Sequence, residues 1–260
     1  MRQEAYFCTV KELDELGKNN IPRQLISHTH LIYSSPATLA FNSPGAEGFG
    51  VKRAGLAVPD SVMLIVSPGC CGRNTSVLSS MRAYQDRFYY LLMDETDIVT
   101  GRHLKKIPKA VAEICEGLKK KPSVVMICIT CVDALLGTDM ERVCHKAEEY
   151  AGVPVRPCYM YALTREGRKP PMVHVRQSVY SLLEPKKKKG NVVNLLGYFS
   201  PLTDDCELYD LLHGAGVKTI HEISRCKDYA QYQTMSEANF NLVLHPDCLL
   251  YTSPSPRDAH

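Results

Sequence analysis

Two groups of cysteines in this sequence stand where they could bind a metal. Cys70 and Cys71 follow an apolar run that is closed by a Ser-Pro-Gly turn. Gly69 and Gly72 flank the pair and let the backbone turn tightly against a bulky inorganic group. Cys131 follows a second apolar run, at the expected N-terminus of a helix, which favours the thiolate form of cysteine. Both arrangements are suited to soft-metal ligation.

The spacing of Cys128 and Cys131 is also found in zinc knuckles and in thioredoxin-like dithiols. Neither kind of site fits this sequence well. A zinc knuckle has this two-residue gap, but strand alternation points the two positions to opposite faces, and no partner pair stands at matching spacing. A thioredoxin-like dithiol begins at a helix start, whereas Cys128 lies inside the apolar run. We therefore interpret Cys128 as a core residue. Most of the 11 cysteines are expected to be buried thiols of this kind, in a reducing compartment.

The segments that would position the candidate ligands are predicted to be buried strands of a parallel sheet. Residues 62–66 and 123–129 are short, apolar and rich in β-branched side chains. Between them, residues 104–120 repeat apolar positions at intervals of three and four, which is typical of an amphipathic helix. Open α/β sheets form their sites at the carboxyl ends of the strands, so Cys70 and Cys131 are expected at such ends.

The alternation of helix and strand continues along the chain. Beyond residue 130 the pattern predicts a helix from Val132 to Ala151 and then a strand around residues 153–155. The other predicted elements are a short helix near residues 11–16, a strand at 191–197, a helix at 204–213 and strands at 217–220 and 240–244.

Charged and aromatic residues near these elements allow more than one interpretation. Asp94 and Glu95 fit a solvated helix start. Arg73, beside the cysteine turn, could offset thiolate charge or form a salt bridge with Asp97. The aromatic side chains between residues 82 and 92 are expected to pack on a helix: Tyr84, Phe88, Tyr89 and Tyr90.

The chain is expected to contain four parts. Residues 1–55 form a turn-rich N-terminal segment that wraps another part of the protein. Residues 56–187 and 190–247 form two Rossmann-like α/β domains, of which the second is incomplete. Residues 248–260 have no period and two prolines, and they resemble a translated sequencing-adapter read-through. We therefore expect a non-native tail on a chain that is cut short.

Composition argues against several classes of protein. The 260 residues are 45% hydrophobic and 23% charged, which is enough for a packed core. The 31 basic and 28 acidic residues leave a net charge of +3, and the run Lys186–Lys189 falls in an expected loop, so no nucleic-acid groove is indicated. Neither a membrane-spanning run nor a signal peptide is recognisable. We predict a cytoplasmic protein that binds neither nucleic acid nor membrane.

Three ordered segments resemble nitrogenase component 1 and its relatives. Residues 66–70 resemble the glycine–cysteine turn of this family. Residues 93–106 resemble its segment of acid, Asp, Ile, Val, Phe, Gly and Gly, and residues 129–139 resemble its segment that contains Thr-Cys and ends in Gly-Asp-Asp. Residues 191–198 are similar to the strand that opens its second domain. The family includes nitrogenase, its cofactor-assembly scaffold, the dark protochlorophyllide and chlorophyllide reductases, and a reductive cyclase of nickel tetrapyrrole synthesis.

The resemblance implies an α/β iron–sulfur protein of repeated Rossmann-like domains, each a parallel sheet flanked by helices. Cys70 and Cys131 match cluster ligands of the family, and Cys71 is the reserve ligand. Gly69 and Gly72 would shape the turn around the cofactor. Two ligands per chain imply one 4Fe-4S cluster shared across a subunit interface. The implied partners are an ATP-dependent iron protein and a second component 1 subunit, which is either an identical copy or a paralogue.

The sequence departs from nitrogenase itself in two places. Residues 42–46 lack the earlier cluster cysteine that nitrogenase subunits carry before the first strand. Leu244 and His245 stand where the nitrogenase cofactor hangs from a cysteine, so dinitrogen reduction is not supported. His245 could ligate a different metal centre, although a lone histidine at a strand end is more often a hydrogen-bonded structural residue.

The features above predict a catalytic-component subunit of a nitrogenase-like reductase, which receives electrons through the cluster and reduces a substrate that the sequence does not name. Two alternatives stay open. One is a non-catalytic scaffold on which a nitrogenase-type metal cofactor is assembled. The other is a plain α/β binding domain with buried thiols.

Overall fold

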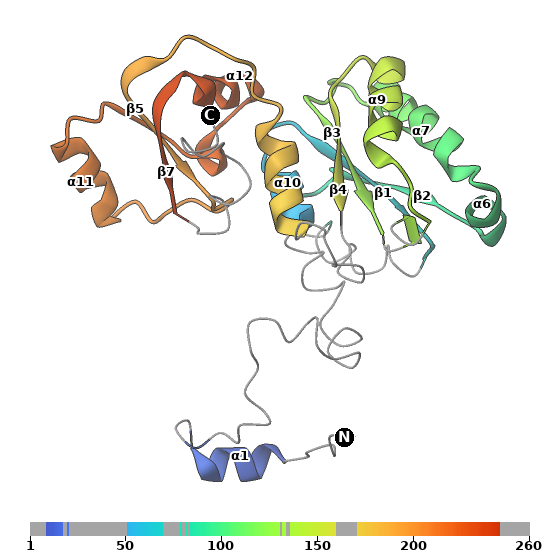
Figure 1. Cartoon of the computed structure of the whole chain (residues 1–260), viewed down its shortest axis with the longest axis horizontal. Helices are drawn as coiled ribbons and strands as arrows, with labels where there is room; N and C mark the ends of the chain where they lie inside the picture. Colours follow the sequence, from blue (N-terminus) through green and yellow to red (C-terminus); the bar gives the residue numbers. More distant parts are fainter. Residues whose placement is uncertain are drawn as a thin grey trace, which may run out of the picture. The chain divides into compact units, whose positions relative to one another are not determined.

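The structure is a computed structural model of the whole chain (Figure 1). It describes residues 9–17, 20, 51–69, 79, 82, 84–130, 132–133, 136–159 and 171–244. The chain divides into two compact units, Met1–Ser43 and Pro44–His260. In the first unit, helix α1 (Val10–Leu16) confirms the helix predicted near residues 11–16.

The first sheet of the second unit has four parallel strands in the order β2-β1-β3-β4. Every residue of the central strands β1 (Val62–Ser67) and β3 (Val125–Ile129) is buried. The outer strands are β2 (Phe88–Leu92) and β4 (Val155–Tyr159). Central strands that are buried along their whole length are typical of a parallel sheet covered on both faces, as the sequence predicts.

Helices cover both faces of this sheet (Figure 1). One face packs on α7 (His103–Gly117) and α9 (Met140–Ala151). The other face packs on α10 (Pro171–Tyr180) and on the helical residues 51–55. A short helix, α6 (Glu95–Thr100), follows β2 in the chain. Because β1, β2 and β3 are parallel, the segments that follow them all begin at the carboxyl edge of this sheet.

Residues 88–92 form a strand, and their aromatic side chains pack on helices as expected: Phe88 belongs to the core that contains α10, and Tyr89 packs against the core that contains α7. β2 pairs with β1 in register, from Met63 opposite Phe88 to Ser67 opposite Leu92. Phe88 is buried, whereas Tyr90 is 42% exposed. Aromatic side chains fit a pleated, half-buried surface, and the pairing with β1 selects the strand.

Helix α9 begins at Met140, whereas the apolar pattern predicts a single helix from Val132 onward. Gly137 adopts a left-handed backbone conformation with φ of 65°. Asp139 then caps the new helix by accepting a hydrogen bond from the Arg142 N–H at 3.1 Å. A left-handed residue cannot continue a right-handed helix, so the predicted helix is interrupted at this glycine.

The second sheet has three parallel strands in the order β6-β5-β7. The central strand is β5 (Lys189–Leu196), and β6 (Thr219–His221) and β7 (Ala238–Val243) flank it. Short helices connect these strands: α11 (Glu207–Gly214), η3 (Ile223–Arg225), α12 (Tyr229–Gln233) and η4 (Thr234–Glu237). The predicted fold class, α/β with parallel sheets flanked by helices, is confirmed.

One apolar core joins the first sheet to the helices of the second. Tyr232 is fully buried in this core, and its hydroxyl donates a hydrogen bond to the Val179 carbonyl. The side-chain amide of Gln233 donates to the Leu182 carbonyl at 2.7 Å and accepts from the Glu184 N–H at 2.9 Å. The two sheets therefore share buried contacts through the region of α10.

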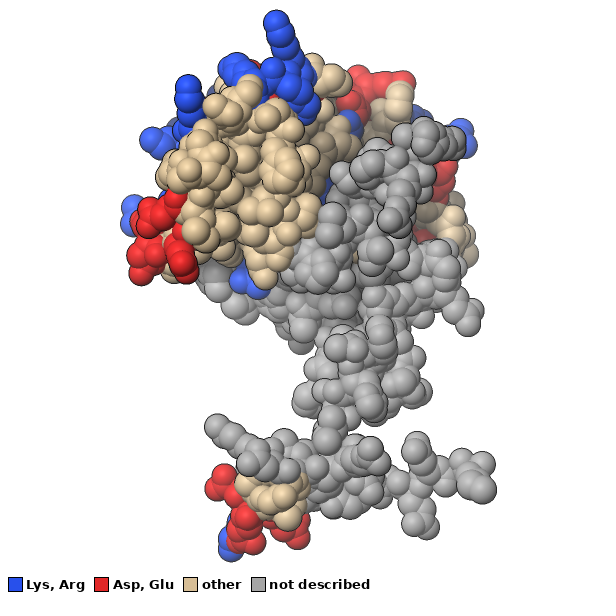
Figure 2. Space-filling model, turned by 60° about the vertical axis from the view of Figure 1, so that its left-hand side comes forward, with Lys and Arg blue, Asp and Glu red and all other residues tan. Residues whose placement is uncertain are grey.

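The lysine run between the sheets is exposed and partly paired. The Lys188 ammonium donates to the Ser236 carbonyl at 2.8 Å, and Lys189 pairs with Glu237 at 2.5 Å. Figure 2 shows basic and acidic side chains around the margin of one face, whose middle carries mostly uncharged residues. Across the described ranges, the helices are too short or too polar to span a bilayer.

Residues 248–260 lie outside the described residues, as do most of residues 1–55. The non-native tail, the wrapping N-terminal segment and the division of the remainder at residues 187–190 therefore stay predictions.

Candidate functional site

The residues predicted as ligands, Cys70, Cys71 and Cys131, lie outside the described residues, as does Gly72. Gly69, which precedes Cys70, and Thr130 and Val132, on either side of Cys131, are described. Gly69 is exposed just after β1, and a Cβ added there would have no heavy atom within 4 Å. Among the described residues, none therefore crowds Gly69.

The carboxyl ends of β1 and β3 lie side by side, because the two strands are paired in register up to Val66 and Ile129. The next residues, Ser67 and Thr130, are fully buried and point to the same face of the sheet. Neither hydroxyl has a hydrogen-bond partner within the described part of the chain. Buried hydroxyls are nearly always partnered in folded proteins, so two unpartnered ones at one sheet edge indicate a place for a ligand atom.

A buried histidine–aspartate pair lies just after this edge in the chain. Nε2 of His103, the first residue of α7, lies 2.9 Å from Oδ1 of Asp133, and both side chains are 1% exposed. Oδ1 also accepts a hydrogen bond from the Thr138 hydroxyl at 3.2 Å. Nδ1 of His103 lies 3.0 Å from the Asp97 carbonyl, which can only accept, so Nδ1 carries a hydrogen.

The second carboxylate oxygen of Asp133, Oδ2, is buried and has no partner among the described residues. With the hydroxyls of Ser67 and Thr130, it makes three unpartnered oxygens at or shortly after the ends of β1 and β3. Burying such groups without hydrogen bonds costs about 1–3 kcal/mol each. The two hydroxyls can donate hydrogen bonds and the carboxylate oxygen can accept them. The groups at this edge could therefore bind a polar or ionic ligand.

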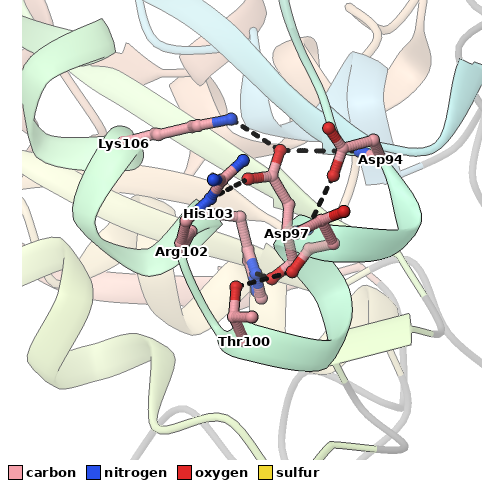
Figure 3. Close-up of polar contacts among 7 residues, drawn as sticks. Asp94, Asp97, Thr100, Arg102, His103 and Lys106 are labelled. Carbon is pink, nitrogen blue, oxygen red and sulfur yellow. Dashed lines mark hydrogen bonds and ion pairs between the residues drawn. The ribbon is translucent and has the colours of Figure 1, made fainter.

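Figure 3 shows the polar cluster that precedes the pair, at the starts of α6 and α7. Asp94 caps α6 and accepts from the Asp97 N–H at 2.6 Å, which confirms the helix start predicted here. The Asp97 carboxylate, 1% exposed, binds Lys106 at 2.6 Å and Arg102 at 3.2 Å. The hydrogen bond from Lys106 is the main reason why the pKa of Asp97 lies below its usual value, although burial opposes it. Arg73 lies outside the described residues, so its suggested roles stay predictions.

Sequence reasoning did not identify His103 or Asp133. Both residues lie in segments that resemble the family, 93–106 and 129–139, but the resemblance gives neither a role, and a lone histidine in a helical segment is ambiguous. Their positions in the predicted order of strands and helices could have brought them together. His103 is the first residue of the helix that follows β2 and α6, and Asp133 lies in the helical turn after β3. Segments that follow neighbouring parallel strands begin at the same edge of the sheet.

The fully buried cysteines of the described chain are core thiols. Cys128 is fully buried, which confirms its interpretation as a core residue, and Cys158 lies opposite it on β4. Burial raises the pKa of Cys158 and of Cys144 well above the usual range, so both stay protonated. Within the described ranges, no three His, Cys, Asp or Glu side chains are grouped so that they could hold a metal ion.

A satisfied network closes the carboxyl end of β6. Glu222, 6% exposed, accepts from the Tyr209 hydroxyl, from Nε of Arg225 at 2.9 Å and from the Leu202 N–H at 3.0 Å. Because its carboxylate is fully used, we interpret this network as structural. His245, the other candidate ligand, lies outside the described residues.

A groove of about 620 Å³ lies next to the histidine–aspartate pair, between α6, α7 and α9. His103 and Thr138 line it. Two of its apolar side chains, Val99 and Leu136, are 85% and 50% exposed. Basic residues, including Lys105, also line it. The groove offers apolar contacts and positive charge close to the strand ends.

Known proteins resemble this chain over most of its length. Residues 47–253 match the family model of nitrogenase component 1 type oxidoreductases. The nitrogenase iron-molybdenum cofactor biosynthesis protein NifE of Rhizobium meliloti (strain 1021) is 28% identical over 176 residues, which cover 65% of this chain and 37% of that protein. NifE of Klebsiella pneumoniae is 26% identical over 222 residues, which cover 77% of this chain and 48% of that protein. The chain therefore spans less than half the length of these two relatives.

Solved structures show the same fold. The chain matches one of nitrogenase Cp1 at pH 5 with a TM-score of 0.54 and 22% identity, over 77% of this chain and 43% of that one. Nitrogenase Cp1 at pH 6.5 matches with a TM-score of 0.52 and 22% identity, over 74% and 40% of the two chains. The parallel sheets and the match over residues 47–253 agree. The chain belongs to the nitrogenase component 1 type oxidoreductase family.

Proposed function

We propose that this protein is part of a scaffold on which a nitrogenase-type metal–sulfur cofactor is assembled. The observation that carries the proposal is the similarity to NifE proteins, whose name describes them as iron-molybdenum cofactor biosynthesis proteins. This similarity favours the scaffold, which the sequence pattern leaves as an alternative, over the catalytic reductase that the pattern predicts first.

The proposed site is the carboxyl edge of the first sheet. Cys70 and Cys131 are the proposed cluster ligands and Cys71 the reserve, with Gly69 and Gly72 shaping the turn. The unpartnered hydroxyls beside the edge support this assignment, because hydroxyls donate hydrogen bonds to the sulfur atoms of iron–sulfur clusters. When bound, a cluster would supply reversible electron transfer. The chain's own part is to hold it and to exclude water at this edge.

A second subunit is part of the proposal. Two ligands from one chain leave a 4Fe-4S cluster half coordinated, so another copy or a paralogous component 1 chain would supply the remaining thiolates. The cluster would then lie at the interface between the subunits. Oligomer formation and cluster binding are therefore expected to depend on each other.

The test is iron and sulfide analysis of anaerobically purified protein, with electron paramagnetic resonance after reduction by dithionite. We expect about two irons per chain, since a 4Fe-4S unit divided between two subunits contributes two to each. Cys131→Ala is expected to abolish the resonance. A colourless protein with no iron would contradict the proposal and favour a plain binding domain.

The matched control is Cys128→Ala. Cys128 lies in the apolar core on the strand that precedes the proposed ligand. The change is expected to lower stability by roughly 1 kcal/mol and to leave the resonance intact. Loss of the resonance in both variants would show that the signal reports folding and not ligation.

A reductase is the second candidate function. The family description as oxidoreductases favours it, as does the groove with exposed Val99 and Leu136, which could receive an ATP-dependent iron protein. Supplying that iron protein and ATP separates the two functions. A reductase turns over substrate, whereas a scaffold passes on its cluster and reduces nothing.

A cytoplasmic location is also part of the proposal. The described cysteines Cys115, Cys128, Cys144, Cys158, Cys206 and Cys226 form no disulfide with one another. Six described cysteines without such a disulfide support a reducing compartment, where disulfides are rare.

A further inference from the structure

Arg176 is a buried arginine whose charge has no carboxylate partner among the described residues. It lies on α10 and is 5% exposed. Its Nη2 donates a hydrogen bond to the Gly197 carbonyl at 3.1 Å, whereas Nε is buried and unpartnered in the described chain. None of the ion pairs between described residues includes Arg176. The guanidinium is therefore short of hydrogen-bond acceptors and of negative charge.

The two groups that contact this guanidinium do not supply a negative charge. The ring centroid of Phe199 lies 6.0 Å from Cζ of Arg176, at the outer limit of a cation–π contact. The Gly197 carbonyl contributes only its dipole. A guanidinium stays charged in proteins, and burying a charge without a counter-ion costs free energy. Binding of an anion would remove this cost.

Arg225 shows the arrangement that Arg176 lacks. Its side chain is 41% exposed, yet it forms ion pairs with Glu222 at 2.9 Å and with Asp204 at 2.7 Å. Within the described chain, a more accessible arginine thus has two carboxylate partners and a buried one has none. This is the reverse of what the cost of burying a charge favours, unless a ligand supplies the counter-ion of Arg176.

Arg176 reaches the carboxyl edge of the second sheet. Its acceptor Gly197 follows β5, which pairs with β6 up to Asn194 opposite His221. Ser224 lies as many residues beyond His221 as Gly197 lies beyond Asn194. The Ser224 hydroxyl is buried and has no hydrogen-bond partner within the described ranges. Unpartnered donors from α10 and from η3 therefore accompany the edge at which open α/β sheets bind ligands.

We propose that Arg176 binds a small oxyanion, which is a carboxylate or an inorganic oxyanion, at the carboxyl edge of the second sheet. The N–H groups along one edge of a guanidinium match two oxygens of such a group. A water molecule would satisfy Nε but would leave the charge uncompensated. The inference does not rest on the proposed function, because Arg176 is separate from the proposed cluster ligands.

The first measurement is thermal unfolding of the full chain without an added oxyanion. Arg176→Met removes an uncompensated buried charge at similar side-chain length, so the melting temperature is expected to rise. Arg176→Gln also removes the charge but keeps an N–H donor for the Gly197 carbonyl, and it is expected to melt no lower than the parent. The matched control, Arg225→Met, breaks two ion pairs and is expected to melt at a lower temperature.

The second measurement is calorimetric titration with sodium phosphate and with sodium succinate, at an ionic strength held constant with sodium chloride. At least one of these probes is expected to bind the parent. Its affinity is expected to fall about tenfold or more in Arg176→Met and Arg176→Gln, as is typical when a hydrogen bond to a charged group is lost. Arg225→Met is expected to keep the parent affinity. Binding of phosphate alone would identify an inorganic oxyanion, and binding of succinate alone an organic acid.

Three results would overturn the assignment. Neither probe binds the parent, or both Arg176 variants bind the probes as tightly as the parent does. The third is a lower melting temperature in Arg176→Met and Arg176→Gln alike, which would show that the charge is already compensated in the protein. Neither measurement involves iron, so protein without a cluster tests this proposal equally well.

Discussion

At the scale of single residues, the carboxylate of Asp97 forms ion pairs with Arg102 and Lys106 at the start of α7. Lys106 first, and then Arg102 and the Asp94 N–H, hold its pKa below the usual value (Figure 3). A carboxyl group with a lowered folded pKa stabilises the fold above its unfolded pKa. That contribution is lost as the pH falls from about 4 through the folded pKa.

We therefore predict that Asp97→Asn lowers the unfolding temperature at neutral pH and that the deficit shrinks as the pH falls below about 4. Thermal unfolding followed by circular dichroism over this pH range checks the prediction. Glu116→Gln removes an exposed carboxylate of α7 and serves as the control. A deficit that stays constant with pH would show that Asp97 acts through packing rather than through its charge.

The backbone of Gly55 lies so close to neighbouring side chains that a Cβ would not fit there. A Cβ there would lie 2.8 Å from Sγ of Cys158 and 2.8 Å from Cε of Met63. Both neighbours belong to the buried core, so one of them would have to move. We predict that Gly55→Ala lowers the free energy of unfolding by about 1–3 kcal/mol, measured by urea denaturation. Gly190→Ala, where a Cβ meets nothing within 4 Å, should show no such overpacking loss.

At the scale of elements, α9 ends where the sequence predicts, because Gly152 adopts a left-handed conformation with φ of 61°. Its N–H donates to the Glu148 carbonyl at 2.8 Å and closes the last turn. The same helix begins later than the apolar stripe predicts, because the stripe continues across the left-handed Gly137. Periodicity detects the face that a helix buries, but it does not detect where a left-handed residue interrupts the helix.

Two glycines at helix ends should respond in opposite ways to alanine. Gly152→Ala forces a side chain into the left-handed region and is predicted to destabilise the protein by about 1 kcal/mol. Gly117 ends α7 without a left-handed backbone, and a Cβ there meets nothing within 4 Å. Gly117→Ala is therefore predicted to stabilise by about 0.5–1 kcal/mol. Urea midpoints of the two variants that move in the same direction would contradict this explanation.

At the scale of the whole molecule, the shared core should make the two sheets unfold together. Tyr232, on α12, is buried against Val179, whose helix α10 packs on β4. Removing this side chain leaves a cavity in a core that both sheets use. We predict that Tyr232→Ala costs about 3–5 kcal/mol and lowers hydrogen-exchange protection in peptides from β3 and β5 alike.

Hydrogen exchange followed by mass spectrometry measures that coupling. Tyr232→Phe serves as the mild control, because it removes only the hydrogen bond to the Val179 carbonyl and should cost about 1–2 kcal/mol. Protection lost in β5 alone would mean that the first sheet is stable without the second. That outcome would also favour two independent folding units in place of one.

Local patterns in the amino-acid sequence were sufficient for part of this picture. The apolar runs 62–66, 123–129 and 191–197 identified β1, β3 and β5, because central strands of a covered parallel sheet are apolar along most of their length. Parallel strands end at a common edge, so the same runs also assigned the candidate cysteines to that edge. The three motifs around them indicated the family without any coordinates.

The remainder depended on contacts between residues distant in the chain. Phe88–Leu92 became a strand because β1 was there to pair with it, and the core at Tyr232 formed only when α10 and α12 met. His103 and Asp133 are separated by 30 positions, and nothing in either local pattern indicates the other. A hydrogen bond between such residues is created by the folded backbone, which alone brings the segments after β2 and β3 to the same edge.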